Sequence, residues 1–213
     1  MLSVSPFMAK AILEGPISRF SDESKGSTSY LVTAKKSFID QTSEKLYQYA
    51  LDEGADRLPF QFEDYYAKIS TVSGNGSFLN AFGFSFNDDV SYSNLAALDW
   101  NAFGMGSNFK LVPANSSLII GGNVAYSKYA IELNEVNEEP RYSELKGLQA
   151  NFDFSYFGRN SEVRYGVEFN ANKTVFNFTN FRQIPIDVEE NNTELAGYLK
   201  YRVVLGRWVL DPS

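Results

Sequence analysis

Residues 148–171 constrain the fold most, because their side chains alternate between apolar and polar on both sides of one short link. Apolar residues occupy alternate positions before and after a polar link at residues 158–161. They are Leu148, Ala150, Phe152, Phe154, Tyr156, Val163, Tyr165, Val167, Phe169 and Ala171. Such alternation predicts strands with one apolar face. The link, Gly-Arg-Asn-Ser, is rich in turn-forming residues. We therefore expect a long antiparallel hairpin.

The other parity of this hairpin carries amides and charges of both signs, including Asp153, Arg164 and Glu168. A packed soluble core does not accept such groups unpaired, because burying an unpaired charge is very costly. A sheet that is apolar outside and polar inside is typical of transmembrane β-barrels. The pattern predicts an all-β fold, a meandering antiparallel transmembrane β-barrel.

Composition supports this fold class and excludes several functions. The 213 residues include 18 Phe and 13 Tyr, which favour strands and membrane interfaces. The 26 acidic and 19 basic residues give a net charge of -7, which repels phosphate backbones, so we expect no nucleic-acid partner. The chain has no Cys and no His, the usual thiolate ligand and general base. We expect no enzyme, no cofactor and no metal site.

Two kinds of short motif have a functional and a structural interpretation. The acidic pairs at 88–89, 138–139 and 189–190 could suggest Ca²⁺ ligands, but each offers too few oxygens. We interpret them as solvated loop charge. The Gly-Met-Gly sequence at 104–106 is half of a nucleotide fingerprint, yet no helix is expected to follow it. Close packing in a barrel wall is the better interpretation.

The same alternation predicts about ten strands along the whole chain. They cover residues 7–14, 30–38, 62–73, 78–86, 100–112, 118–131, 148–156, 163–171 and 194–205, and one more opens at 207. One short helix is expected inside a loop, at about residues 43–53, with Thr42 or Ser43 as its N-cap and Gly54 as its stop.

The predicted connections differ in length. Short turns at 73–77, 113–117, 158–161 and 205–207 alternate with long loops at 41–59, 87–98, 132–144 and 176–192. Outer-membrane barrels place short turns on the periplasmic rim and long loops on the outer rim. The sequence therefore predicts the direction of every strand.

Several strings resemble the barrel of TonB-dependent receptors, the outer-membrane transporters, of the kind found in Bacteroidota-type bacteria. Residues 4–17 resemble the first hairpin after the plug and close on a Glu-Gly-Pro-Ile turn at 14–17. Residues 29–40 resemble the next strand, and residues 192–198 and 210–213 resemble mid-barrel segments.

The resemblance implies that residues 1–213 are a partial barrel domain, roughly the first half of a barrel of about 22 strands. The signal peptide, the TonB box, the plug and the distal strands are then absent from it. The family sits in outer-membrane lipid of the bacterial cell and imports a scarce nutrient, of the siderophore, vitamin, glycan or peptide class, with energy that TonB delivers through the plug. The resemblance leaves open whether a surface lipoprotein caps the barrel as a further partner. No functional residue of the family can be carried over.

Five charged residues are candidates for the lumen of such a barrel: Asp153, Arg164, Glu168, Lys200 and Arg202. They could line a ligand path. We favour the interpretation that they contact a plug, hold water or pair with one another.

Two alternatives remain. About 8–10 strands can close on their own, so the chain could be a complete small outer-membrane barrel. It could also be a soluble β-barrel that binds a small ligand. The direction of the aromatic face distinguishes the soluble barrel from the two membrane proteins.

Overall fold

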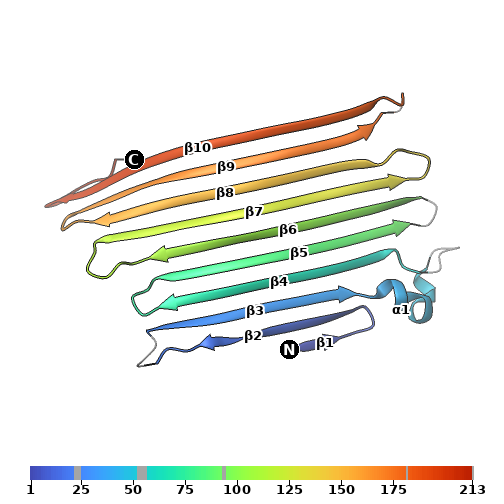
Figure 1. Ribbon diagram of the computed structural model, residues 1–213, viewed down its shortest axis with the longest axis horizontal. Coiled ribbons are helices and arrows are strands. Elements are labelled where there is room, and N and C mark those ends of the chain that lie inside the picture. The colour runs from blue at the N-terminus through green and yellow to red at the C-terminus, as the bar shows by residue number, and fades with distance from the viewer. Residues whose placement is uncertain (22–24, 52–56, 93–94, 181, 213) are drawn as a thin grey trace.

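The computed structural model describes residues 1–21, 25–51, 57–92, 95–180 and 182–212. Eleven strands form one antiparallel sheet, and their order in space is their order in the chain (Figure 1). The strands are β1 (Leu2–Val4), β2 (Met8–Ser18), β3 (Gly26–Ser37), β4 (Phe60–Ser73), β5 (Phe78–Tyr92), β6 (Ala96–Leu111), β7 (Leu118–Glu135), β8 (Arg141–Phe157), β9 (Ser161–Thr179), β10 (Pro185–Leu205) and β11 (Trp208–Leu210). The predicted all-β meander is confirmed.

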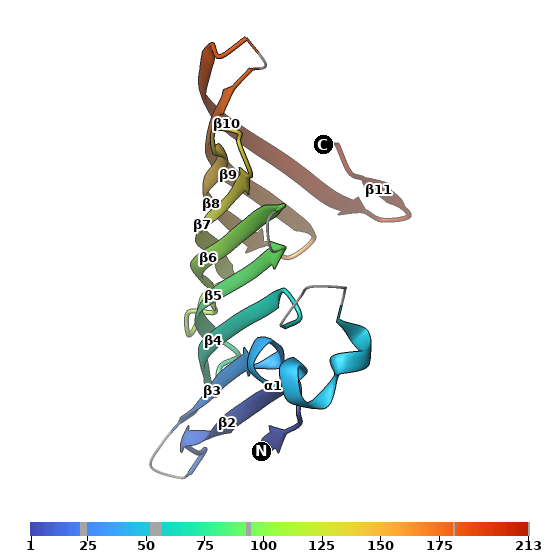
Figure 2. The same ribbon diagram turned by 90° about the vertical axis from the view of Figure 1, so that its right-hand side faces the viewer.

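The sheet is open and has no core of its own. Strands β1 and β11 form its two edges and do not pair with each other. Figure 2 shows the sheet bent, with α1 (Ile39–Leu46) and β11 on the same side. Among the described residues, Ala130 is the only buried apolar one. The accessible surface is 14760 Å², against about 9,900 Å² for a compact monomer of this mass. The chain therefore folds as a single-layered wall.

Three of the four predicted long loops are wrong, because the strands continue through most of them. The actual connections are residues 93–95, 136–140 and 180–184. Ladder hydrogen bonds join backbone groups and do not depend on the polarity of the side chains. Polar side chains also pair across these extensions: the indole N–H of Trp100 donates to Asp88 Oδ2 over 2.7 Å. We call the rim with these connections and α1 the helix rim, and the other the turn rim.

The predicted helix lies in the connection foreseen for it but begins earlier. It spans Ile39–Leu46 and is followed by the 3₁₀ turn η1 (Gln48–Ala50). Its N-cap is Phe38, without a side-chain cap, and the predicted stop at Gly54 lies outside the described residues. Within the described part of the chain, no helix is long and apolar enough to cross a membrane.

The two hydroxyls expected to cap this helix connect it to other segments. Thr42 Oγ1 donates to the carbonyl of Pro6 over 2.7 Å. Ser43, which is fully buried, accepts a hydrogen bond from the N–H of Leu58 over 2.9 Å. The helix is therefore held against the strand ends on both sides of it.

The turn predicted at residues 14–17 is also wrong. These residues lie within β2, where Pro16 pairs with Ser29 on β3 and the register shifts just after it. A bulge accommodates a proline, which has no N–H for the ladder. The first hairpin turns instead at residues 5–7, where the N–H of Ser5 donates to the carbonyl of Met8 over 2.9 Å.

Candidate functional site

The register of the sheet assigns every strand residue to one of two faces. Directly opposite residues of an antiparallel pair share a face, and from β3 to β10 the register runs without a shift. Leu148 lies opposite Tyr126 on β7 and Ala171 on β9. We call the face that carries Leu148 the apolar face and the opposite one the polar face.

On the apolar face, apolar side chains form a continuous band near the turn rim. On β8 this band covers residues 148–156, about the 9–11 residues that a tilted strand needs to cross a membrane. Leu148 is 42% exposed and Phe152 is 40% exposed, so these large side chains lie on a surface. We call this surface the apolar band. Charged residues border it toward the helix rim: Lys36 on β3, Glu63 on β4, Lys128 on β7, Lys146 on β8 and Lys173 on β9.

The border of the apolar band runs obliquely to the strands. One row of directly opposite residues crosses it: Ala34, Tyr65, Ser85, Phe103, Lys128, Lys146, Lys173 and Asn191. The row starts inside the band at Ala34 and ends outside it at Asn191. The strands are therefore tilted relative to the band, as the strands of a membrane barrel are tilted relative to the bilayer.

The phenylalanines of β5 face the polar side, where they cover two glycines of β6. A Cβ atom on Gly104 would lie 2.5 Å from the ring of Phe84, and one on Gly106 would lie 3.0 Å from that of Phe82. The rings of Phe84 and Phe86 stack with 4.9 Å between their centroids. The interpretation of residues 104–106 as a close-packing element is confirmed.

All five lumen candidates lie on the polar face, and three of them meet near the turn rim. Arg164 on β9 lies directly opposite Lys200 on β10. Lys200 Nζ lies 3.4 Å from Asp211 Oδ1, and Arg164 pairs with Glu162. These four residues and Arg202 line a hollow of about 200 Å³. Cations therefore outnumber carboxylates in this cluster.

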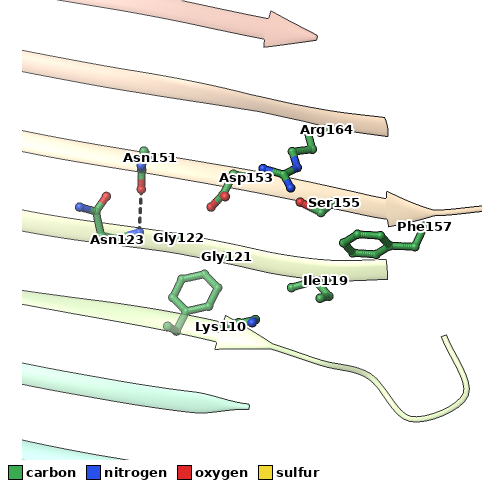
Figure 3. Close-up of a pocket in the computed structure, with 11 residues that line it drawn as sticks. Lys110, Ile119, Gly121, Gly122, Asn123, Asn151, Asp153, Ser155, Phe157 and Arg164 are labelled. Atoms are coloured by element: carbon green, nitrogen blue, oxygen red, sulfur yellow. Dashed lines mark hydrogen bonds between the residues drawn. The ribbon is translucent and has the colours of Figure 1, made fainter. Parts of the chain in front are cut away.

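Asp153 belongs to a neighbouring hollow of about 430 Å³ on the same face (Figure 3). In this view the guanidinium of Arg164 points from β9 toward Asp153 on β8. Arg164 lines both hollows. Glu168 lies apart from them and accepts a hydrogen bond from Asn170 Nδ2 over 3.1 Å. The structure thus groups four of the five candidates and leaves Glu168 outside.

A row of asparagines crosses the polar face and was missed by the sequence analysis. Asn80, Asn108, Asn123 and Asn151 are directly opposite one another on β5 to β8. Asn80 Nδ2 donates to Asn108 Oδ1 over 2.8 Å, and Asn151 Oδ1 accepts from the backbone N–H of Asn123 over 2.9 Å. All four asparagines lie on the polar face, but only the register shows that they align, since Asn80 shares its parity on β5 with several phenylalanines. The row suits contact with water or with a polar protein surface.

Just beyond the apolar band, one carboxylate joins two strands. Glu144 Oε2 lies 2.9 Å from Lys128 Nζ, and Glu144 Oε1 lies 2.6 Å from Lys146 Nζ. The hydroxyl of Tyr142 donates to Glu144 over 2.9 Å. The hydrogen bond from Lys146, with those from Lys128 and Tyr142, lowers the pKa of Glu144 to about 2 although burial opposes the shift. Glu144 therefore stays ionised in the folded chain.

Neither face offers a metal site in the described ranges, which contain no group of three or more His, Cys, Asp or Glu side chains able to hold an ion. The polar face presents charges and amides to open hollows, whereas the apolar face presents hydrocarbon. This arrangement suits contact with lipid on one side and with water or a polar partner on the other.

Comparison with known proteins gives no matching family model and no matching curated sequence. Among solved structures, the ferric yersiniabactin uptake receptor FyuA from Yersinia pestis matches with a TM-score of 0.50 and 10% sequence identity. The match covers 94% of this chain and 35% of the receptor, so the chain spans about a third of that receptor's length. At this identity the likeness shows the fold alone, that of an outer-membrane β-barrel wall.

Proposed function

We propose that this chain is part of the barrel wall of a TonB-dependent transporter, which imports a scarce nutrient across the bacterial outer membrane. The oblique apolar band is the observation that carries the proposal. It exposes large apolar side chains over a height that matches a bilayer, and its tilt against the strands is the geometry of a membrane barrel. The likeness to a ferric siderophore uptake receptor supports the transport class.

The two alternatives fit the structure less well. A soluble ligand-binding barrel turns its apolar face inward. Because the open sheet leaves both faces exposed, the likeness to an uptake receptor, and not exposure, favours the membrane barrel. A complete small barrel needs its first and last strands to pair, and β1 and β11 do not. We therefore assign the sheet to a wider barrel, in which further strands continue from both edges.

In this proposal the polar face lines the lumen. We place the turn rim at the periplasm, because the longest connection, residues 38–59, lies on the helix rim. Asp153, Arg164, Lys200 and Arg202 lie near the turn rim and contact the plug or hold water beside it. TonB acts on the plug and not on this wall. The first nutrient class to test is a ferric siderophore, after the receptor that this chain resembles. Vitamins, glycans and peptides are the classes to test next.

Nutrient uptake by cells tests the proposal. The full-length gene that encodes this chain is deleted and restored, and uptake of labelled ferric siderophores, vitamins, glycans and peptides is measured with and without TonB. We expect the protein in the outer-membrane fraction, and one class of uptake that requires both the gene and TonB. Recovery of the protein in the soluble fraction, or uptake that continues without TonB, would contradict the proposal.

A further inference from the structure

Three lysines lie side by side where the apolar band ends. Lys128, Lys146 and Lys173 are directly opposite one another on β7, β8 and β9, and we call them the lysine row. The next residues of the same face toward the turn rim belong to the band: Tyr126, Leu148 and Ala171. The lysine row therefore sits at the edge of the surface that we assign to lipid.

Like charges that are directly opposite in a sheet repel each other, and two carboxylates only partly compensate. Glu144 contacts Lys128 and Lys146, and Glu189 Oε1 lies 2.6 Å from Lys173 Nζ. Three ammonium groups are thus in contact with two carboxylates, which leaves an excess of positive charge within the row, while Glu132 and Asp187 lie farther toward the helix rim on the same face. The three lysine side chains are 36%, 37% and 39% exposed. Each ammonium has three N–H groups, so donors remain for a ligand.

The rest of the border differs from this sector. On β3 and β4, Lys36 pairs with Glu63 and leaves no excess of charge. On β5 to β7, Asp89, Asp99 and Glu132 are directly opposite one another on the same face, farther toward the helix rim than the lysine row, and these carboxylates repel anions. An anion at the edge of the band is therefore attracted to the lysine row itself and not to this acidic row.

We propose that the lysine row binds the phosphate groups of lipid headgroups in the outer leaflet. Headgroups lie at the edge of the hydrocarbon layer, and lysines at this level attract anionic lipids. An ammonium group is also a common phosphate ligand in proteins. The inference rests on the proposed function, because it requires the apolar band to lie in the membrane with the helix rim outside.

Lipid retention by the purified full-length protein tests the inference. The protein is extracted from outer membranes in mild detergent and incubated with micelles that contain either phosphatidic acid or diacylglycerol, which differ only in the phosphate group. Bound lipid per protein is then measured by native mass spectrometry. The triple variant Lys128→Gln, Lys146→Gln, Lys173→Gln is compared with a charge-matched control away from the band, Lys10→Gln, Lys45→Gln, Lys68→Gln.

We expect the triple variant to retain about fivefold less phosphatidic acid. This factor corresponds to the attraction of about one lysine to an anionic surface, because Glu144 and Glu189 neutralise part of the lysine row. Diacylglycerol binding should not change, and the control should match the wild type. Replacing the three lysines with arginine should keep the binding of phosphatidic acid. This result would show that the loss in the glutamine variant is not a folding defect. Excess inorganic phosphate should not displace the lipid.

Equal retention by the triple variant and the wild type would overturn the inference, as would an equal loss of both lipids. Displacement of the lipid by inorganic phosphate would show that the lysine row binds an adventitious ion only, and this result would also overturn the inference. Absence of the wild-type protein from the outer membrane is a different result, because it contradicts the proposed function itself.

Discussion

The two halves of β8 share one backbone ladder but carry different side chains. In the half near the turn rim, residues 148–156 alternate strictly, and Leu148 pairs with Ala171. In the half near the helix rim, the apolar face carries Glu144 and Lys146, and Lys146 pairs with Lys173 in the same register. The backbone therefore pairs both halves of β8 in one register, whereas the polarity of the side chains on a face follows what surrounds each half. Alternation therefore marks the half of β8 that carries the apolar band and not the whole strand.

The largest expected effect comes from a charge in the apolar band. Phe152→Arg in the full-length protein should lower the free energy of unfolding by about 2–4 kcal/mol, because it places a cation near the middle of the bilayer. Unfolding from lipid vesicles in urea measures the change. The matched control is Gln149→Arg, which places the same side chain on the polar face of the same strand. Equal losses at both positions would contradict the assignment of the faces.

A smaller effect is expected where the aromatic rings of β5 cover β6. Gly104→Ala should lower the free energy of unfolding by about 1–3 kcal/mol, because the new methyl overlaps the Phe84 ring. Gly83→Ala is the control, since its nearest neighbour would be the Gly104 carbonyl oxygen at 3.6 Å, an ordinary contact. The same unfolding experiment separates the two variants, and a harmless Gly104→Ala would contradict the packing of these rings.

The smallest effect concerns the helix-rim half and depends on pH. Since the pKa of Glu144 in the folded chain, about 2, lies below its ordinary 4.5, its carboxylate contributes full stability above about pH 4.5 and loses it as the pH falls toward 2. Glu144→Gln should therefore cost about 1 kcal/mol at neutral pH and should flatten the loss of stability between these values. A variant with the pH profile of the wild type would show that Glu144 does not link the two lysines.

Sequence patterns predicted the apolar band on strands in which one set of alternate positions is apolar and the other set is polar. Residues 148–171 are the clearest case, and the pattern placed all five charged candidates on the polar face. On β5 the pattern fails to give a direction, because Phe82 and Phe84 on one parity oppose Leu79 and Ala81 on the other. Only pairing with Gly104 and its neighbours on β6 decides which side the rings occupy.

The two missed rows share one physical cause, which is that register joins residues far apart in the chain. The asparagine row and the lysine row each need several strands in alignment before they exist. The acidic stretches at 87–98, 132–144 and 176–192 looked like loops because their side chains are polar, but most of their residues belong to strands. The turn predicted at 14–17 was wrong because a bulge keeps Pro16 inside β2.

Accessibility along β8 tests the central claim most directly. Single cysteines at positions 144 to 156 of the full-length protein are spin-labelled in lipid vesicles, and collisions with lipid-soluble oxygen and with a water-soluble nickel chelate are measured. We expect oxygen contact at the even positions from 148 to 156, nickel contact at the odd positions between them, and nickel contact again at 144 and 146. Equal oxygen contact at 151 and 152, or lipid contact that continues through 144, would contradict this claim.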